Sequence, residues 1–215
     1  MRTRTKMITV AMVAFALAAI VVAPTVAGWP KGNMEEPEMS ALAFHDTWRK
    51  LWEDHIWWTR MVIIGIFDDL AGTGNYTERL IQNYEDMEDA LMPFYEDDAK
   101  KLGDLIQKHL LIAAQILVEA KAGHDITALS DTWYANANDI AMTMNDLNSK
   151  YWPLDEAKAM WKMHLDLTLE EAVKHLQKDW KGDVEAFDKV HLAALEMADF
   201  FSNGIIRQFP QMFTE

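Results

Sequence analysis

The sequence predicts an all-α protein, an antiparallel up-and-down bundle of four to five main helices that follows an N-terminal signal or anchor segment. Apolar residues recur with the period of an α-helix through almost the whole chain after residue 40. Glycine and proline interrupt this pattern at intervals of about 25 residues, the spacing of helices joined by short turns. No stretch alternates apolar and polar residues for long enough to indicate a strand.

The first 27 residues have the composition of an export signal. Basic residues precede an uncharged apolar run over residues 7–23, and residues 24–27 supply a proline and the small side chains of a cleavage site. The run is longer than the apolar part of a usual signal peptide and slightly short for a membrane-spanning helix. Residues 1–27 are therefore expected to be either a cleaved signal peptide or an N-terminal membrane anchor.

Both alternatives place the rest of the chain outside the cytoplasm, either secreted or anchored to the cell membrane through residues 7–23. Residues 28–40 contain glycine, proline and several glutamates, so a spacer is expected there. The helical bundle domain then covers residues 41–213.

The first helix is expected over residues 44–66, where apolar residues follow the spacing of one helix face. Residues 72–75, which include two glycines, break the chain. Two shorter helical pieces are expected over residues 77–83 and 86–92. The second piece ends before Pro93, because proline lacks the N–H group that continues a helix.

The next apolar stripe, residues 102–120, predicts a long helix that ends at Gly123. Asp125 is a suitable cap for the following helix, which covers residues 126–147. The chain therefore reverses over residues 121–125.

Pro153 restarts the chain at a favourable first helical position, and residues 157–171 carry one face of the helix that follows. Gly182 and Asp183 predict another break and cap. The last helix is expected over residues 184–207.

The composition excludes several classes of function. The chain contains no cysteine, which rules out disulfides, iron–sulfur clusters and thiolate metal sites. Its net charge of −14 argues against nucleic acid and anionic lipid surfaces as partners. The motifs of α/β-hydrolases, phosphate-binding loops, zinc proteases and di-iron carboxylate oxidases are absent.

Three histidines, His55, His109 and His164, occur near the middle of three different predicted helices, each on the apolar face. Asn136 occupies the same depth on a fourth helix. Antiparallel helices of similar length bring their midpoints together, so these side chains are expected to meet at one level of the bundle. Neutral imidazole is a common metal ligand, and the set therefore predicts either a metal or cofactor site or a buried polar network.

Further candidates surround this set. Asp139 and Glu171 are the carboxylates expected to complete a metal site, while Arg60, Trp58 and Thr168 are expected behind the ligands. Two branches of the metal hypothesis remain open at this point. Met160, one turn before His164, would suit copper, and two of the histidines would suit heme.

Several stretches of the chain resemble a poorly characterised helical family of bacteria and archaea, some of whose members carry the label acetylglutamate kinase. The stretches are LWEDHIWWTR (51–60), PFY (93–95), HLLIAAQ (109–115), WYANA (133–137) and QFP (208–210). The resemblance covers about residues 48–213 and implies a coherent helical domain. It implies no reaction, because kinases of that class have an α/β fold with a glycine-rich phosphate site and this sequence offers neither.

The sequence thus predicts an exported helical-bundle protein that binds a small molecule, a partner helix or another envelope protein. The alternative is a metal- or heme-binding bundle, redox-active in one version, with a site at His55, His109 and His164. No catalytic motif assigns an enzymatic reaction.

Overall fold

A computed structural model of the protein describes residues 39–214, and this part is almost entirely helical. The all-α class is therefore confirmed. The expected signal or anchor segment, residues 1–27, lies outside the described residues. Residues 28–38 of the expected spacer lie outside them as well. The helices of the described part are α1 (Ala41–Phe67), α2 (Thr73–Tyr95), α3 (Asp97–Lys121), α4 (Thr127–Asn148), α5 (Leu154–Leu176) and α6 (Trp180–Gln208).

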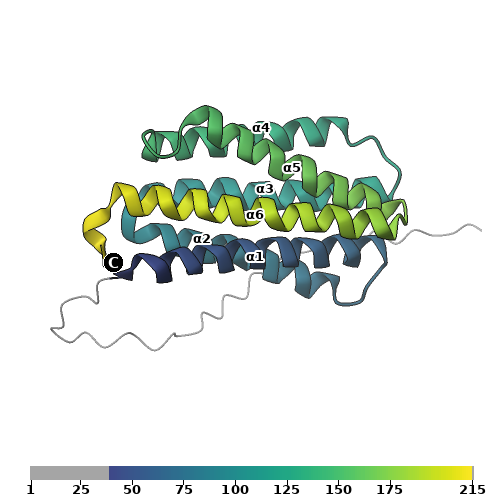
Figure 1. Cartoon of the computed structure of the whole chain (residues 1–215). Helices are drawn as coiled ribbons and strands as arrows, with labels where there is room; N and C mark the ends of the chain where they lie inside the picture. The colour runs from purple at the N-terminus through teal and green to yellow at the C-terminus, as the bar shows by residue number, and fades with distance from the viewer. Residues whose placement is uncertain (1–38, 215) are drawn as a thin grey trace, which may run out of the picture. The chain divides into compact units, whose positions relative to one another are not determined.

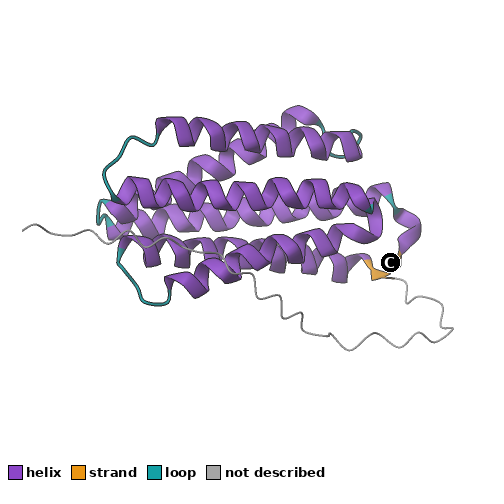
Figure 2. Ribbon diagram, turned by 180° about the vertical axis from the view of Figure 1, so that it is seen from behind, coloured by secondary structure: helices purple, strands orange, loops and turns teal. Residues whose placement is uncertain are grey.

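The helices of residues 39–214 form a closed ring, because each one packs against its neighbours in sequence and α6 also packs against α1. Figure 1 shows this ring as three tiers, with α1 and α2 at the bottom, α3 and α6 in the middle and α4 and α5 at the top. The same tiers are visible from behind in Figure 2. Across the ring, α1 also contacts α3 and α5. These three helices carry the histidines that the sequence singles out.

The two short pieces expected at residues 77–83 and 86–92 form one continuous helix, α2, which also includes Pro93. The expected interruption is absent because Asn83 is held by tertiary contacts that outweigh its low helix propensity. Its amide nitrogen donates to the carbonyl oxygen of Leu51 at 3.0 Å. Pro93 stands in the last turn of α2, so the backbone hydrogen bond that it cannot donate is missing only near the end of the helix.

The expected break at Gly182 and Asp183 is also wrong, because α6 already begins at Trp180. The cap is Asp179, whose carboxylate accepts a hydrogen bond from the backbone N–H of Gly182 at 3.1 Å. Asp183 is thus a buried residue of the first turn rather than a cap. By contrast, Gly123 does follow the end of α3, with a positive φ of 75° that favours glycine.

The two ends of the described domain are joined by a short parallel ladder. Strand β1 (Met39–Ser40) pairs with β2 (Phe213–Thr214), which follows a single 3-10 turn, η1 (Pro210–Met212). Ser40 also caps α1, since its hydroxyl accepts from the N–H of Ala43 at 3.4 Å. Strands of two residues are too short to leave an alternating pattern in the sequence.

Each helix of residues 39–214 is either too short or too polar to span a lipid bilayer.

Gly204 provides a sharp test of packing between α6 and the α4–α5 connection. A Cβ atom added to Gly204 would overlap the indole nitrogen of Trp152, which is buried and donates to the carbonyl of Phe200 at 3.0 Å. We expect Gly204→Ala to lower the free energy of unfolding by about 1–3 kcal/mol, because an overpacked core shifts its backbone. A Cβ added to Gly74 in α2 meets nothing within 4 Å, so Gly74→Ala should be neutral or stabilising. Urea unfolding of both variants measures the contrast, and equal effects would contradict the packing described here.

Candidate functional site

Three buried histidines converge inside the ring, one each from α1, α3 and α5. His55, His109 and His164 are 2%, 1% and 4% exposed. The ring centre of His164 lies 5.4 Å from that of His55 and 5.9 Å from that of His109. We refer to these three residues as the histidine cluster.

Tryptophans surround the histidine cluster and keep it apolar. The ring of Trp52 lies 5.2 Å from His55 and 5.5 Å from His164, while Trp133 stacks on His109 at 5.0 Å. Trp161 is edge-on to His109 at 5.4 Å. Such walls exclude water and lower the local dielectric constant, which disfavours charge on the imidazoles.

The hydrogen bonds of His55 define its tautomer. Its Nδ1 lies 3.1 Å from the amide oxygen of Asn83, and the amide nitrogen of Asn83 donates to Leu51. Because the amide oxygen only accepts, Nδ1 of His55 carries the proton. The lone pair of a neutral imidazole is then on Nε2, the arrangement that an outer hydrogen bond imposes on a metal-binding histidine.

Three buried polar atoms at the histidine cluster make no hydrogen bond of ordinary length, and one of them is the indole nitrogen of Trp52. The other two, Nδ1 of His109 and the amide oxygen of Asn136, are neighbours, because the Asn136 amide raises the pKa of His109 against the larger lowering by burial. The amide nitrogen of Asn136 donates to the carbonyl of Leu105 at 3.2 Å. Buried polar atoms are normally paired, and each unpaired one indicates strain, an unobserved water or ion, or a functional role.

All members of the histidine cluster are uncharged at neutral pH. Burial lowers the pKa of His55 from its ordinary 6.5 to about 4, and that of His109 to about 3. Burial also holds the pKa of His164 well below its ordinary value, and repulsion from the other two histidines adds to this. The cluster therefore presents neutral nitrogen donors rather than a positive charge.

A cavity of about 20 Å³ adjoins the three imidazoles, with Thr59 and Thr168 also in its wall. A water molecule needs about 10–15 Å³ of such space, so the cavity accommodates one water-sized species. A porphyrin is many times larger. The expected heme branch is therefore inconsistent with this packing.

The structure separates the other expected site residues. Thr168 lines the cavity at the histidine cluster and Asn136 lies beside His109, as expected, but Asp139 is exposed on α4. The ring of Trp58 lies 6.4 Å from that of Tyr76 instead, and the tryptophan of α1 that contacts the histidines is Trp52. The side chain of Met160 lines a surface groove, so it does not join His164 in a copper site.

Sequence reasoning missed the tryptophan walls and Asn83. Trp52 precedes His55 by one helical turn, so the periodicity placed it on the same face and could have identified it. Asn83 was hidden because its segment appeared to be the end of a short helix. Only the continuous α2 brings its amide to His55.

Glu171 and Arg60 belong to a separate buried ion network. Arg60 donates to Glu171 at 2.6 Å and forms two bonds of 3.0 Å to Asp183. His175 lies 3.2 Å from Asp183 and 3.2 Å from Asp68. One oxygen of Glu171 has no partner, and burial raises the pKa of this carboxyl to about 7. The network joins α1, α5 and α6 and leaves the histidine cluster without a carboxylate.

The fold and this site define a helical bundle with an uncharged, tryptophan-walled histidine cluster at its centre. Comparison with protein family models, with characterised proteins and with solved structures finds no match. The resemblance to the helical family described above therefore stays an expectation from the sequence.

Proposed function

We propose that the protein is an exported binding protein whose ligand is a metal ion with a filled d shell, Cu⁺ or Zn²⁺, held by the histidine cluster. The observation that carries the proposal is the meeting of three buried, uncharged imidazoles at a cavity for one small species, where Nδ1 of His109 makes no hydrogen bond of ordinary length. Export is proposed from the composition of residues 1–27 alone.

The donors suit such an ion. Imidazole binds metals in its neutral form, so no proton has to be displaced from these three groups at neutral pH. Cysteine is absent from the chain and no carboxylate reaches the cluster, so nitrogen is the principal donor. Nitrogen donors select copper and zinc over magnesium or calcium, which prefer oxygen.

The two ring-centre distances that involve His164 suit a shared ion. Two imidazoles bound to one ion through bonds of about 2 Å have ring centres about 5 Å apart. The observed 5.4 and 5.9 Å are close to this value. With the rings as they stand, no three His, Asp or Glu side chains in residues 39–214 are placed to hold an ion. Binding therefore involves rotation of the imidazoles, and Nδ1 of His109 makes no hydrogen bond of ordinary length that would oppose it.

Charge favours the monovalent ion. Neutral ligands leave the full ionic charge in an apolar interior, and burying two charges costs more than burying one. We expect Cu⁺ to bind more tightly than Zn²⁺, which needs an accompanying hydroxide or another anion to offset its second charge.

We also propose that the helices of residues 39–214 form an antiparallel up-and-down bundle. The connections between them contain at most five residues, whereas the shortest of these helices has 22. Five extended residues span about 18 Å, and 22 helical residues span about 33 Å. Such connections support a reversal of direction between consecutive helices, which places the three histidines at similar depth.

Metal titration tests the proposed function. We expect the metal-free protein to bind one equivalent of Cu⁺ or Zn²⁺, and His109→Leu or His164→Leu to weaken binding at least about 100-fold, as loss of one of three ligands implies. His191→Gln removes a half-buried histidine outside the cluster, which lies 3.0 Å from Glu53, and is the control for binding elsewhere on the protein. Isothermal titration, with a competing chelator for Cu⁺, measures the affinities.

Stability separates a binding role from a structural one. His109→Leu removes an unpaired buried atom and keeps an apolar side chain of similar size, so the metal-free variant should be as stable as the unsubstituted protein. Loss of binding at unchanged stability supports the proposal. Equal metal affinity in His109→Leu and His191→Gln would overturn it.

A further inference from the structure

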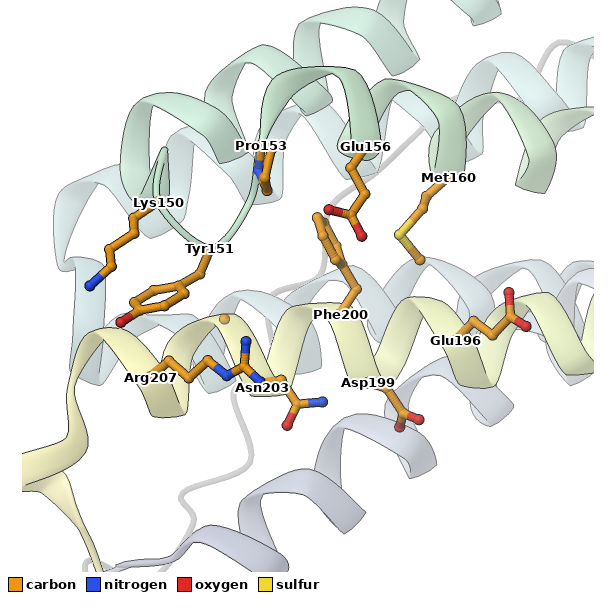
Figure 3. Close-up of a pocket in the computed structure, with 11 residues that line it drawn as sticks. Lys150, Tyr151, Pro153, Glu156, Met160, Glu196, Asp199, Phe200, Asn203 and Arg207 are labelled. Atoms are coloured by element: carbon orange, nitrogen blue, oxygen red, sulfur yellow. The ribbon is translucent and has the colours of Figure 1, made fainter.

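A second hollow of the described residues shares no lining residue with the cavity at the histidine cluster. It has a volume of about 570 Å³ and lies between the start of α5 and the C-terminal half of α6, beside the α4–α5 connection. Figure 3 shows its side chains entering from both sides. We call it the α5–α6 groove. Its volume is typical of sites that bind small molecules.

One end of the α5–α6 groove is cationic. Lys150 lies over the ring of Tyr151, with its ammonium nitrogen 4.8 Å from the ring centre, and the guanidinium of Arg207 lies 6.0 Å from the same ring. None of the ion pairs of residues 39–214 includes Lys150 or Arg207. Two free cations that share one aromatic ring, on a chain of net charge −14, can attract an anionic group.

The other end of the groove is acidic. Glu156 of α5 and Glu196 of α6 line it, both are exposed, and neither is part of an ion pair of the described residues. Asp199 is different, because its side chain turns toward α1 (Figure 3). There it accepts two hydrogen bonds of 2.8 Å from Arg49. The two free carboxylates therefore form a place for a cationic group.

An apolar floor connects the two ends. Phe200 rises from α6 toward Glu156 in Figure 3, and Met160 faces it from α5. Gly204 lies directly against Trp152 and has no side chain that could fill the groove. The organic part of a ligand can therefore lie on Phe200 between the two charged ends.

We propose that the α5–α6 groove binds a small zwitterionic molecule, with its anionic group between Lys150 and Arg207 and its cationic group at Glu156 and Glu196. An ω-amino acid or a short peptide has this chemistry. Opposite charges at the two ends of a cavity select for a ligand that carries both, because a ligand with one charge leaves the other end unpaired. The site shares no residue with the histidine cluster, and its occupation is independent of a metal.

Matched probes test this proposal. Isothermal titration of the whole protein compares 6-aminohexanoate, which carries both charges, with hexanoate and hexylamine, which carry one each. We expect the zwitterion to bind about tenfold more tightly than either, since tenfold corresponds to about 1.4 kcal/mol, the scale of one charge-assisted contact. Its addition should shift the backbone amide signals of Asn203 and Gly204.

Variants show which end of the α5–α6 groove binds the anionic group and which binds the cationic group. Arg207→Gln should weaken 6-aminohexanoate and hexanoate about tenfold and leave hexylamine unchanged, while Glu156→Gln should weaken 6-aminohexanoate and hexylamine and leave hexanoate unchanged. Lys101→Gln removes one exposed cation of α3 outside the groove and is the control for net charge. All three sites are exposed, and thermal unfolding checks that the variants are folded. The absence of binding, equal affinity for the three probes, or equal effects of Arg207→Gln and Lys101→Gln would overturn the proposal.

Discussion

Acidification from pH 7 to pH 5 is expected to lower the free energy of unfolding of the metal-free protein by about 4 kcal/mol, a large part of the stability of a typical domain. The cause is the histidine cluster. Its pKa values in the folded state, about 4 for His55 and about 3 for His109, lie below the ordinary value of 6.5, and that of His164 is also well below it. The unfolded chain therefore binds more protons than the folded protein below pH 6.5.

The direction follows from this difference in bound protons. The contribution of the three neutral histidines to the free energy of unfolding is fully present above pH 6.5. It is lost as the pH falls toward the pKa values of the folded state, by about 1.4 kcal/mol per pH unit for each histidine. The three groups together contribute a loss of about 6 kcal/mol at pH 5. Glu171 acts in the opposite sense, because burial raises its pKa to about 7 and the folded state takes up its proton first. Its contribution is a gain of about 2 kcal/mol over the same interval.

Urea unfolding at several pH values measures this dependence. His109→Leu should reduce the slope between pH 6 and pH 5 by about one third of the histidine contribution, because one of three titrating groups is removed. His191→Gln is the control, since His191 is not buried. An identical slope in His109→Leu and the unsubstituted protein would show that the cluster is already charged, or open to water, in the folded state.

Arg60→Met is expected to lower the free energy of unfolding by about 3–5 kcal/mol at pH 8, the scale for breaking a buried ion pair by removal of one partner. Arg60 is the cation shared by Glu171 and Asp183, and its side chain is 14% exposed while that of Glu171 is 1% exposed. The substitution leaves two carboxylates facing each other in the interior. Arg49→Met is the matched control, because Arg49 and Asp199 form a pair that is 42% and 35% exposed. That control should lose at most about 1 kcal/mol.

The effect of Arg60→Met should also depend on pH. Without the guanidinium, the pKa of Glu171 rises further above its ordinary value, so protonation relieves the unpaired charge as the pH falls. The destabilisation at pH 6 should therefore be smaller than at pH 8, and Glu171→Gln in the same background should recover part of it at pH 8. Chemical unfolding of both arginine variants measures these differences. Equal losses for Arg60→Met and Arg49→Met would contradict a buried network.

Five of the helices could be placed from the sequence to within a few residues, because an amphipathic helix repeats its apolar face many times and each repeat adds to the same signal. The second helix could not. Its polar residues around Asn83 and its late Pro93 give a local signal for interruption, and only contacts with α1 make it continuous. The start of α6 was misplaced for a related reason, since Asp179 and Asp183 are equally good caps in sequence.

The convergence of the histidines was predictable because depth along a helix follows from residue number. Their hydrogen bonds were not, because a helix position fixes a face but not a partner across the ring. Asp139 illustrates this limit. It follows the inward Asn136 by three residues, and the rotation between them is enough to place its carboxylate in solvent. Glu171 shows the complementary case, because it is inward but two turns from His164 and pairs with Arg60.

The ladder between Met39 and Phe213 holds the two ends of the described domain next to each other. Helix α1 packs against both α2 and α6, so the helices follow one another around a circle. The chain enters this circle beside β1. Entry at another connection, for example at the exposed turn around Gly123, would leave each helix next to the same two neighbours. The architecture is in this sense cyclic, and evolution or protein engineering can relocate the termini by joining Thr214 to Met39 without rearranging the interior.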